Sequence, residues 1–324
     1  MGFSRGAYTA RSIAGLVTKL GLLTKRGMDL FPAVYDEYYK DPTSSPNFEF
    51  SADLLKQIGG DLDTSARDAV KIVAVWDTVE FHGEGFGGEK IEFHNAELSP
   101  RIAYAYHALA LDERRIPFIP TLWQWPKGYK VQEGTGLQVM KQVWFSGAHS
   151  DVGGGKYDPR CSDVSLAWML AQCSKDKKLA FTDEDPLNPD DPNEYYLLPD
   201  RLKPNPNTTW AQLASPPTPD PLDTFWDKSW GAIENLASED RKAFPMEDTM
   251  ERIHRSIHDR NQTAWPCGML DGKNQATSWT LKAPSQYGKV LVEAEPDPVA
   301  DAIEDKYRGR VRAPPGSKGY LGKL

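Results

Sequence analysis

Ser4, Asp77 and His149 are the residues of this chain whose types and surroundings fit covalent catalysis. Splitting an ester or an amide in this way needs a hydroxyl nucleophile, a base that takes its proton, and an acid that holds the base in one tautomer. Asp77 and His149 each follow an apolar run, and Ser4 directly precedes a helical sequence. We therefore take them as the candidate nucleophile, orienting acid and base.

Gly2 and Gly6 flank Ser4 in a G-x-S-x-G pattern. This pattern indicates a nucleophile elbow, a tight turn from strand to helix whose flanking residues must lack side chains because backbone passes close by. The first N–H groups of the helix then point at the group under attack, so the backbone N–H of Arg5 is the expected oxyanion donor. The alternative is a pair of loop glycines around a serine that only caps the helix.

The segments next to Ser4 and Asp77 carry clear patterns of secondary structure. Apolar residues recur at three- and four-residue spacing from Ala7 to Leu20, which predicts a helix that ends at Gly21. The run from Val70 to Trp76 is rich in β-branched residues, as in a parallel strand buried on both faces. Asp77 follows this strand directly and so lies at the edge where α/β sheets place their chemistry.

His149 lies in a loop of small residues that follows a short apolar strand at Gln142–Phe145. Three glycines, Gly153–Gly155, leave the backbone almost free of side chains, so we expect close approach to a ligand or to another turn, and a protruding histidine. His254 and His258 also come after Asp77 in the chain. We favour His149 over His254, the alternative base, because only His149 directly follows a predicted core strand.

Further elements are predicted along the chain. His107 is expected to be structural within a helix, and the charged segment 112–115 is expected to form ion pairs without a catalytic role. Thr182–Leu222 holds 10 of the 25 prolines and is expected to be irregular, as is the glycine-rich segment 81–88. The remaining predictions are helices at 31–39, 99–111, 165–173 with a cap near Ser162 or Asp163, 225–236 and 298–306, and one or two strands within 278–294.

Composition excludes several classes of protein. The 324 residues are 40% hydrophobic and 11% aromatic, enough for a large core, and the net charge of −8 offers no basic surface for nucleic acid or anionic lipid. There is no apolar run of membrane-spanning length and no leader, so a cytoplasmic location is the default expectation. Three widely spaced cysteines fit neither a disulfide framework nor a zinc site, and we expect no metal and no cofactor.

Four segments between Gly2 and about Met169 also carry a family resemblance: GFSRGAYTAR, VWDTVE, ALALDERR and VWFSGAHSDVGGG. Together they resemble the α/β-hydrolase family called domain of unknown function 2235, whose bacterial relatives include type VI secretion phospholipase effectors. The resemblance implies a serine hydrolase with phospholipase or esterase activity, in which Ser4 is the nucleophile, Asp77 the acid and a later histidine the base. The stretch Ile253–Ser256 is similar to one found in fungal-type members.

This chain departs from that family at its start. Family members begin with strands that precede the elbow and with an Asp-Gly-Thr segment expected to help form the oxyanion hole, whereas here Met1 directly precedes Gly2. We therefore expect an N-terminally truncated member with weak activity. The expected fold is α/β, with a mostly parallel sheet and flanking helices over residues 1–180, incomplete at its N-terminus. A Pro-rich linker and C-terminal lobe are expected at 181–324.

Three functions remain open at this point. The first is a serine hydrolase that acts on small-molecule or lipid carboxylic esters through Ser4, His149 and Asp77. The second is a catalytically impaired hydrolase fold that serves as a binding or regulatory module. The third is an interaction scaffold that uses the Trp-rich C-terminal lobe, and only composition supports it.

Overall fold

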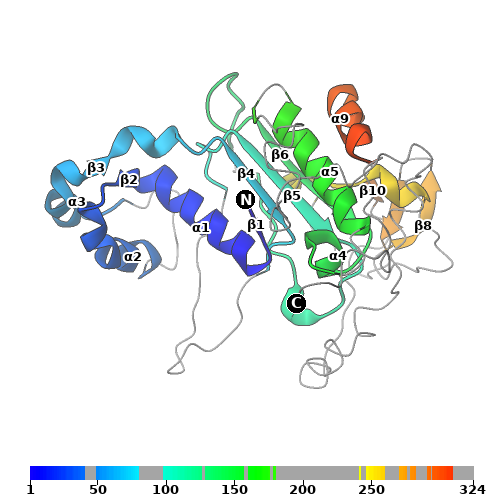
Figure 1. Ribbon diagram of the computed structural model, residues 1–324, viewed down its shortest axis with the longest axis horizontal. Coiled ribbons are helices and arrows are strands. Elements are labelled where there is room, and N and C mark those ends of the chain that lie inside the picture. Colours follow the sequence, from blue (N-terminus) through cyan, green and yellow to red (C-terminus); the bar gives the residue numbers. More distant parts are fainter. Residues whose placement is uncertain are drawn as a thin grey trace, which may run out of the picture. The chain divides into compact units, whose positions relative to one another are not determined.

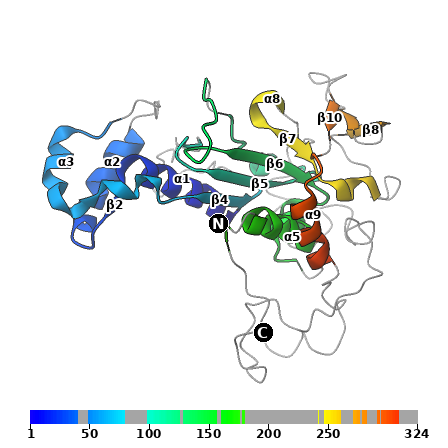
Figure 2. The same ribbon diagram turned by 90° about the horizontal axis from the view of Figure 1, so that it is seen from above.

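The structure is a computed structural model (Figures 1 and 2). The chain divides into two compact units. Unit 1 comprises Met1–His107, Ile116–Gln142 and Phe244–Glu251, and unit 2 comprises Ala108–Arg115, Val143–Ala243 and Arg252–Leu324. The residues described are 1–40, 49–79, 98–125, 128–156, 160–175, 178–179, 241, 246–259, 270–275, 278–281, 290–292 and 294–308.

Unit 1 holds the first part of the chain and several short elements. Its members are β1 (Gly2–Phe3), α1 (Arg5–Leu20), β2 (Leu22–Leu23), η1 (Gly27–Leu30), α2 (Phe31–Lys40), α3 (Ala52–Ile58), η2 (Gly59–Asp61), β3 (Leu62–Asp63), η3 (Thr64–Asp68), β4 (Ile72–Trp76), η4 (Ile116–Phe118) and α8 (Met246–Thr249). Three strands begin in unit 1 and end in unit 2: β5 (Tyr104–Ala110), β6 (Val139–Phe145) and β7 (Glu251–Ile253).

Unit 2 holds the helices and strands of the later chain. Its members are α4 (His149–Gly153), α5 (Arg160–Ser174), η6 (Arg255–Asp259), β8 (Leu270–Gln275), β9 (Ser278–Leu281), β10 (Val290–Val292) and α9 (Pro298–Arg308). The last three strands form an antiparallel sheet in the order β10-β9-β8. Strands within 278–294 and a helix at 298–306 were predicted and are confirmed.

The main sheet has five strands in the order β1-β4-β5-β6-β7. β1 and β4 are parallel, with Gly2 opposite Val75. Backbone bonds also join the starts of β4 and β5, through the Tyr104 N–H and the Lys71 carbonyl, and the ends of β6 and β7, through the His254 N–H and the Trp144 carbonyl. In each of these pairs, the start of one strand lies beside the start of its neighbour, or the end beside the end. The sheet is therefore mostly parallel, and the predicted α/β class is confirmed.

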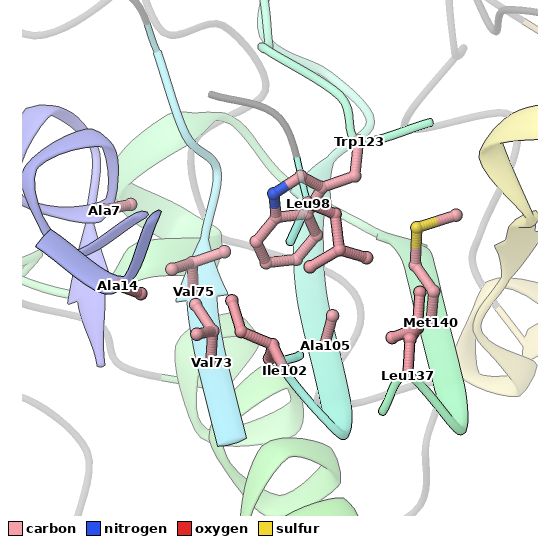
Figure 3. Close-up of a cluster of buried hydrophobic side chains, with 10 residues drawn as sticks. All are labelled: Ala7, Ala14, Val73, Val75, Leu98, Ile102, Ala105, Trp123, Leu137 and Met140. Carbon is pink, nitrogen blue, oxygen red and sulfur yellow. The ribbon is translucent and has the colours of Figure 1, made fainter. Parts of the chain in front are cut away.

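α1 packs on β4 through small residues (Figure 3). Val73 and Val75 of β4 are buried, as are Ala7 and Ala14 on α1. Alanines on this helix face let its backbone lie close to the β-branched residues of the strand, as dense packing requires. The predicted helix 7–20 and strand 70–76 are both confirmed, and they bring the residues before α1 and after β4 to one edge of the sheet.

The far end of α1 belongs to a second apolar cluster. Leu20 packs there with buried residues of α2 and α3 and their neighbours: Val34, Tyr38, Phe50, Leu54 and Ile58. Tyr38 and Phe50 stack with ring centroids 6.2 Å apart. α2 confirms the helix predicted at 31–39, and α1 therefore joins two cores within unit 1.

The helix predicted at 99–111 is wrong, because residues 104–110 form β5 instead. Ser99 begins a turn, in which its carbonyl accepts the N–H of Ile102 at 3.1 Å. Six of the seven residues of β5 are buried, and a strand buried on both faces gives no alternation that distinguishes it from a buried helix. His107 thus lies in a central strand.

The later helices and strands were predicted in part. The helix predicted at 165–173 is confirmed as α5, but it begins at Arg160, ahead of the predicted caps Ser162 and Asp163. β8 was not predicted. The predicted loop 81–88, the irregular region 182–222, the helix 225–236 and the domain boundary near 180 lie outside the described residues.

α5 is the central helix of unit 2 and packs against α4 and α9. Cys161 and Cys173 are buried on it as free thiols, and burial raises the pKa of Cys173 to about 11. Lys175, just after α5, binds Asp297, just before α9, at 2.6 Å. The two cysteines behave as the unreactive core residues that the sequence predicted.

Candidate active site

Ser4 occupies the single-residue turn between β1 and α1. Its φ and ψ angles of 59° and −129° are rare for any residue other than glycine. The Ser4 N–H donates to the Trp76 carbonyl at 3.0 Å, and the Ser4 carbonyl accepts from Ala7 and Tyr8 at 3.0 and 3.2 Å. Strand pairing thus ends and the helix begins at one residue.

The side chain of Ser4 makes no capping hydrogen bond to α1 within the described structure. This disfavours the alternative in which the serine only caps the helix. Arg5 is the first residue of α1, so its backbone N–H lies at the helix N-terminus, where the helix dipole favours negative charge.

The two glycines around Ser4 differ in what they do. A Cβ on Gly2 would lie 2.4 Å from the Gly6 carbonyl oxygen and 2.8 Å from the Ala7 Cα, which no side chain tolerates. A Cβ on Gly6 would meet nothing within 4 Å. The expected close approach is therefore confirmed for Gly2 and wrong for Gly6.

Asp77 follows β4 directly and is fully buried. Its φ of 40° is left-handed, a conformation that aspartate tolerates better than most residues. Phe3 pairs with Trp76 in parallel register, so Ser4 and Asp77 are the next residues on two neighbouring strands. The structure brings these two candidates together at the carboxyl edge of the sheet.

His107 holds the backbone just after Asp77. The Thr78 N–H donates to His107 Nε2 at 3.0 Å, so this nitrogen accepts and Nδ1 carries the proton, which it donates to the Gln142 side chain at 3.0 Å. Gln142 in turn donates to the carbonyls of Trp123 and Thr249 at 2.9 and 2.6 Å. His107 has the structural role that the sequence predicted.

His149 is the first residue of α4 and only 4% exposed, so the expectation of a protruding histidine is wrong. Three consecutive backbone N–H groups before and at the start of this helix each donate to a different carboxylate. Gly147 donates to Asp112 at 2.6 Å, Ala148 to Asp151 at 2.9 Å, and His149 to Glu113 at 3.2 Å. The turn that carries His149 is thus held by acidic side chains.

Glu113 was assigned no functional role from the sequence, yet it binds the candidate base. Burial alone would raise the pKa of its carboxyl, but hydrogen bonds and charge from Arg115, with the charge of Arg241, bring the pKa below its usual range. The ion pairing predicted for the charged segment 112–115 is present between Glu113 and Arg115. Nothing in their spacing indicated that a turn 36 residues later would be the partner.

The glycines of the histidine turn also differ from expectation. Gly154 and Gly155 have φ of 91° and 97°, but a Cβ on either would meet no atom closer than 3.9 Å. The close approach occurs instead at Gly147, with φ 108°, where a Cβ would lie 2.5 Å from the Asp151 Cβ. Asp151 also binds Lys156 at 3.1 Å. Gly154 and Gly155 therefore supply backbone conformation and make no close approach to another described segment.

His254, the alternative base, is buried with both ring nitrogens in hydrogen bonds. Nδ1 lies 2.8 Å from Ser256 Oγ, and Nε2 lies 2.7 Å from Glu304 Oε1 on α9. The ring also stacks on Phe145 at 4.5 Å. These contacts join β7, η6 and α9 within unit 2, a structural use of the imidazole.

Ser4 and Asp77 lie in unit 1, and His149 and His254 lie in unit 2. The triad as a whole therefore stays a prediction. Among the described residues, no group of three or more His, Cys, Asp or Glu side chains is arranged to hold a metal ion. None of the described helices is long and apolar enough to cross a membrane.

Comparison with known proteins gives two matches and one negative result. A yeast protein from Saccharomyces cerevisiae (strain ATCC 204508 / S288c), named as the uncharacterized protein YEL023C, is 26% identical over 134 residues, which are 38% of this chain and 19% of the yeast protein. The chain thus matches about a fifth of the length of that relative. No solved structure matches the chain.

The family described as "T6SS, Phospholipase effector Tle1-like, catalytic domain" matches residues 1–172, more than half of the 324 residues. This region contains Ser4, Asp77, Glu113 and His149, and it ends within α5. The predicted resemblance to type VI secretion phospholipase effectors is confirmed at this level, while the narrower assignment to domain of unknown function 2235 stays a prediction. The chain belongs to the family of Tle1-like phospholipase effector catalytic domains.

Proposed function

We propose that this protein hydrolyses carboxylic esters, with lipid esters as the substrate class, through Ser4, His149 and Asp77 on an α/β-hydrolase fold. The observation that carries the proposal is the backbone of Ser4, a strained residue between a parallel strand and a helix, inside a match to a phospholipase catalytic family. The family name supports the lipid substrate by analogy, and the turn supports the nucleophile.

The reaction would follow the serine-hydrolase scheme. Ser4 Oγ attacks the ester carbonyl carbon while its proton passes to His149, and the tetrahedral oxyanion forms near the N-terminus of α1, where the Arg5 N–H lies. The intermediate expels the alcohol, which takes the proton from His149. Water then attacks the acyl-enzyme and gives a proton to His149, which passes it to Ser4 Oγ as the intermediate collapses and the carboxylic acid leaves.

Asp77 is the proposed orienting acid. It follows β4 as Ser4 follows β1, in adjacent parallel strands, and it is fully buried, as a residue that fixes a histidine tautomer should be. His149 is preferred to His254 as base because it lies in the region that matches the phospholipase catalytic family, whereas His254 lies outside that region and binds Ser256 and Glu304. A base needs one ring nitrogen for the serine and one for the acid.

A fluorophosphonate probe tests the proposal directly. The full chain should become labelled at Ser4, as located by peptide mass spectrometry, and should hydrolyse a short-chain p-nitrophenyl ester and phospholipid vesicles. The Ser4→Ala chain should do neither. A folded full chain that binds phospholipid vesicles but resists the probe would overturn the enzymatic proposal in favour of the binding module that the sequence left open.

A further inference from the structure

The carboxylate of Glu113 accepts hydrogen bonds on both of its oxygens. Oε1 accepts from the backbone N–H groups of Arg114 and Arg115 at 3.0 and 2.9 Å and from Arg115 Nε at 2.9 Å. Oε2 accepts from Arg115 Nη2 at 2.8 Å and from the His149 N–H at 3.2 Å. The Glu113 side chain is 0% exposed and that of Arg115 only 15%.

Such a pair is rigid for geometric reasons. The planar guanidinium of Arg115 binds both carboxylate oxygens side by side, which fixes the plane of the carboxylate as well as its distance. Arg241 adds a second positive charge from another segment and donates to the Ala110 carbonyl at 2.7 Å. Because Glu113 is buried and charged, rotating it away would leave an unpaired charge in the core.

We propose that Glu113, locked by Arg115, is a positioning residue that fixes the backbone of His149 and thereby aims its imidazole. The inference rests on the proposed function, in which His149 is the base. It assigns a role to the charged segment 112–115, which lies in unit 2 together with the histidine turn.

The effect on catalysis follows from geometry. Proton transfer requires the base within hydrogen-bond reach of the nucleophile, and displacement of a catalytic group by about 1 Å can cost about 100-fold in rate. The N–H of His149 sits one bond from the Cα that carries the imidazole, so loss of its acceptor acts on the side chain through the backbone. Substrate binding does not involve this bond, so kcat should fall while KM changes little.

Glu113→Gln is the main test because it keeps the size of the side chain and removes the charge. Its NH2 group faces donors from Arg115 and His149, so at least one hydrogen bond becomes a clash of two donors. We expect kcat for a soluble p-nitrophenyl ester to fall about 10- to 100-fold, with KM within about 3-fold of wild type. Glu113→Asp keeps the charge and should recover part of the loss.

Glu304→Gln provides a matched control. Glu304 is another buried carboxylate of unit 2, and within the described part of the chain its partners are His254 and Arg255 rather than the histidine turn. Its loss should lower the melting temperature about as much as Glu113→Gln does, with kcat within about 3-fold of wild type. Amide hydrogen exchange at His149 should rise about 10- to 100-fold in Glu113→Gln and stay unchanged in Glu304→Gln.

Measuring both kcat and amide exchange at His149 separates a failure of this inference from a failure of the proposed function. A wild-type chain without esterase activity or Ser4 labelling would refute the function, while the exchange at His149 would still test whether Glu113 holds the turn. Unchanged exchange in folded Glu113→Gln would overturn the inference, as would unchanged kcat in an active enzyme. Equal loss of kcat in Glu113→Gln and Glu304→Gln would also overturn it, by showing general destabilisation instead.

Discussion

The turns at Ser4 and His149 look alike in outline but are held by different means. Each follows a strand of the parallel sheet, each leads into a helix, and each contains a left-handed residue, Ser4 at φ 59° and Gly147 at φ 108°. At both turns the closest approach is local, Gly2 against Gly6 at the first and Gly147 against Asp151 at the second. The first turn is also held by pairing with the backbone of β4, whereas the second is held by side chains of a distant segment, Asp112 and Glu113.

This difference explains why the sequence predicted the geometry of the Ser4 turn but not the contacts that hold the His149 turn. A local contact restricts residue types within a few positions and so leaves a motif, as G-x-S-x-G does. A contact between residues 36 positions apart produces no motif. The sequence shows only a charged tetrapeptide and a separate loop of small residues, and nothing in either indicates that they meet. The first turn can be broken by changing neighbours, and the second by changing its distant anchors.

The largest expected effect comes from removing the reacting groups themselves. Ser4→Ala and His149→Ala should each lower kcat for a short-chain ester by about 10⁴-fold or more, and the double variant should lose little beyond either one, because triad members act as a unit. Steady-state hydrolysis measures this. If the two losses multiply in the double variant, Ser4 and His149 do not share one mechanism.

The next effect distinguishes the two glycines of the first turn. Gly2→Ala should destabilise the full chain by about 3 kcal/mol, because its Cβ would overlap the Gly6 carbonyl oxygen and the strand or helix must move. Gly6→Ala places a methyl in open space on a helix and should change the free energy of unfolding by less than about 1 kcal/mol. Urea denaturation compares them, and equal losses would show that the close contact at Gly2 is not tight.

Periodicity and composition predicted the parts of the fold where one pattern is strong. The helix after Ser4 was predicted from apolar spacing and the strand before Asp77 from its apolar, β-branched run, and both are present. The prediction of a helix at 99–111 was wrong because the turn at Ser99 resembles a helix start and because β5 is buried on both faces. Burial on both faces removes the alternation on which strand prediction depends.

The candidate site was predictable to a similar extent. Ser4 was proposed from the G-x-S-x-G pattern and the helix after it, and Asp77 because it follows a predicted strand; the register of β1 and β4 makes them the next residues on neighbouring strands. Glu113 was missed because its role depends on which distant backbone N–H groups it meets. Likewise, nothing in the sequence around His254 indicated that Glu304 on α9 would occupy one of its ring nitrogens.

A smaller effect is expected from the glycines of the histidine turn. Gly147 and Gly155 both have left-handed φ, so alanine at either position is strained by about 1 kcal/mol. Gly147→Ala must also displace Asp151, whose Cβ would be 2.5 Å away, whereas Gly155→Ala meets nothing within 4 Å. The melting temperature should fall further for Gly147→Ala. A larger fall for Gly155→Ala would contradict the packing described for this turn.

The smallest expected effect is a pair of opposite pH dependences at this turn. Arg115 brings the pKa of Glu113 below its usual range despite burial, so the stability it contributes is present above the ordinary glutamate pKa of about 4.3. That contribution is lost as the pH falls through the lowered folded value. Burial raises the pKa of Asp151, opposed by Lys156, so its contribution is present below the ordinary aspartate pKa of about 3.9 and is lost as the pH rises through the raised value.

Thermal unfolding between about pH 3.5 and pH 7 therefore separates the two carboxylates. Relative to wild type, Glu113→Gln should lose more stability at pH 7 than at the acid end. Asp151→Asn should behave in the opposite sense, because it removes a buried charge that wild type must carry at neutral pH, with a difference of about 1 kcal/mol or less. If the stability of the two variants changed with pH in the same way, Glu113 and Asp151 would have similar environments. The contacts of Arg115 would then give Glu113 no advantage over Asp151.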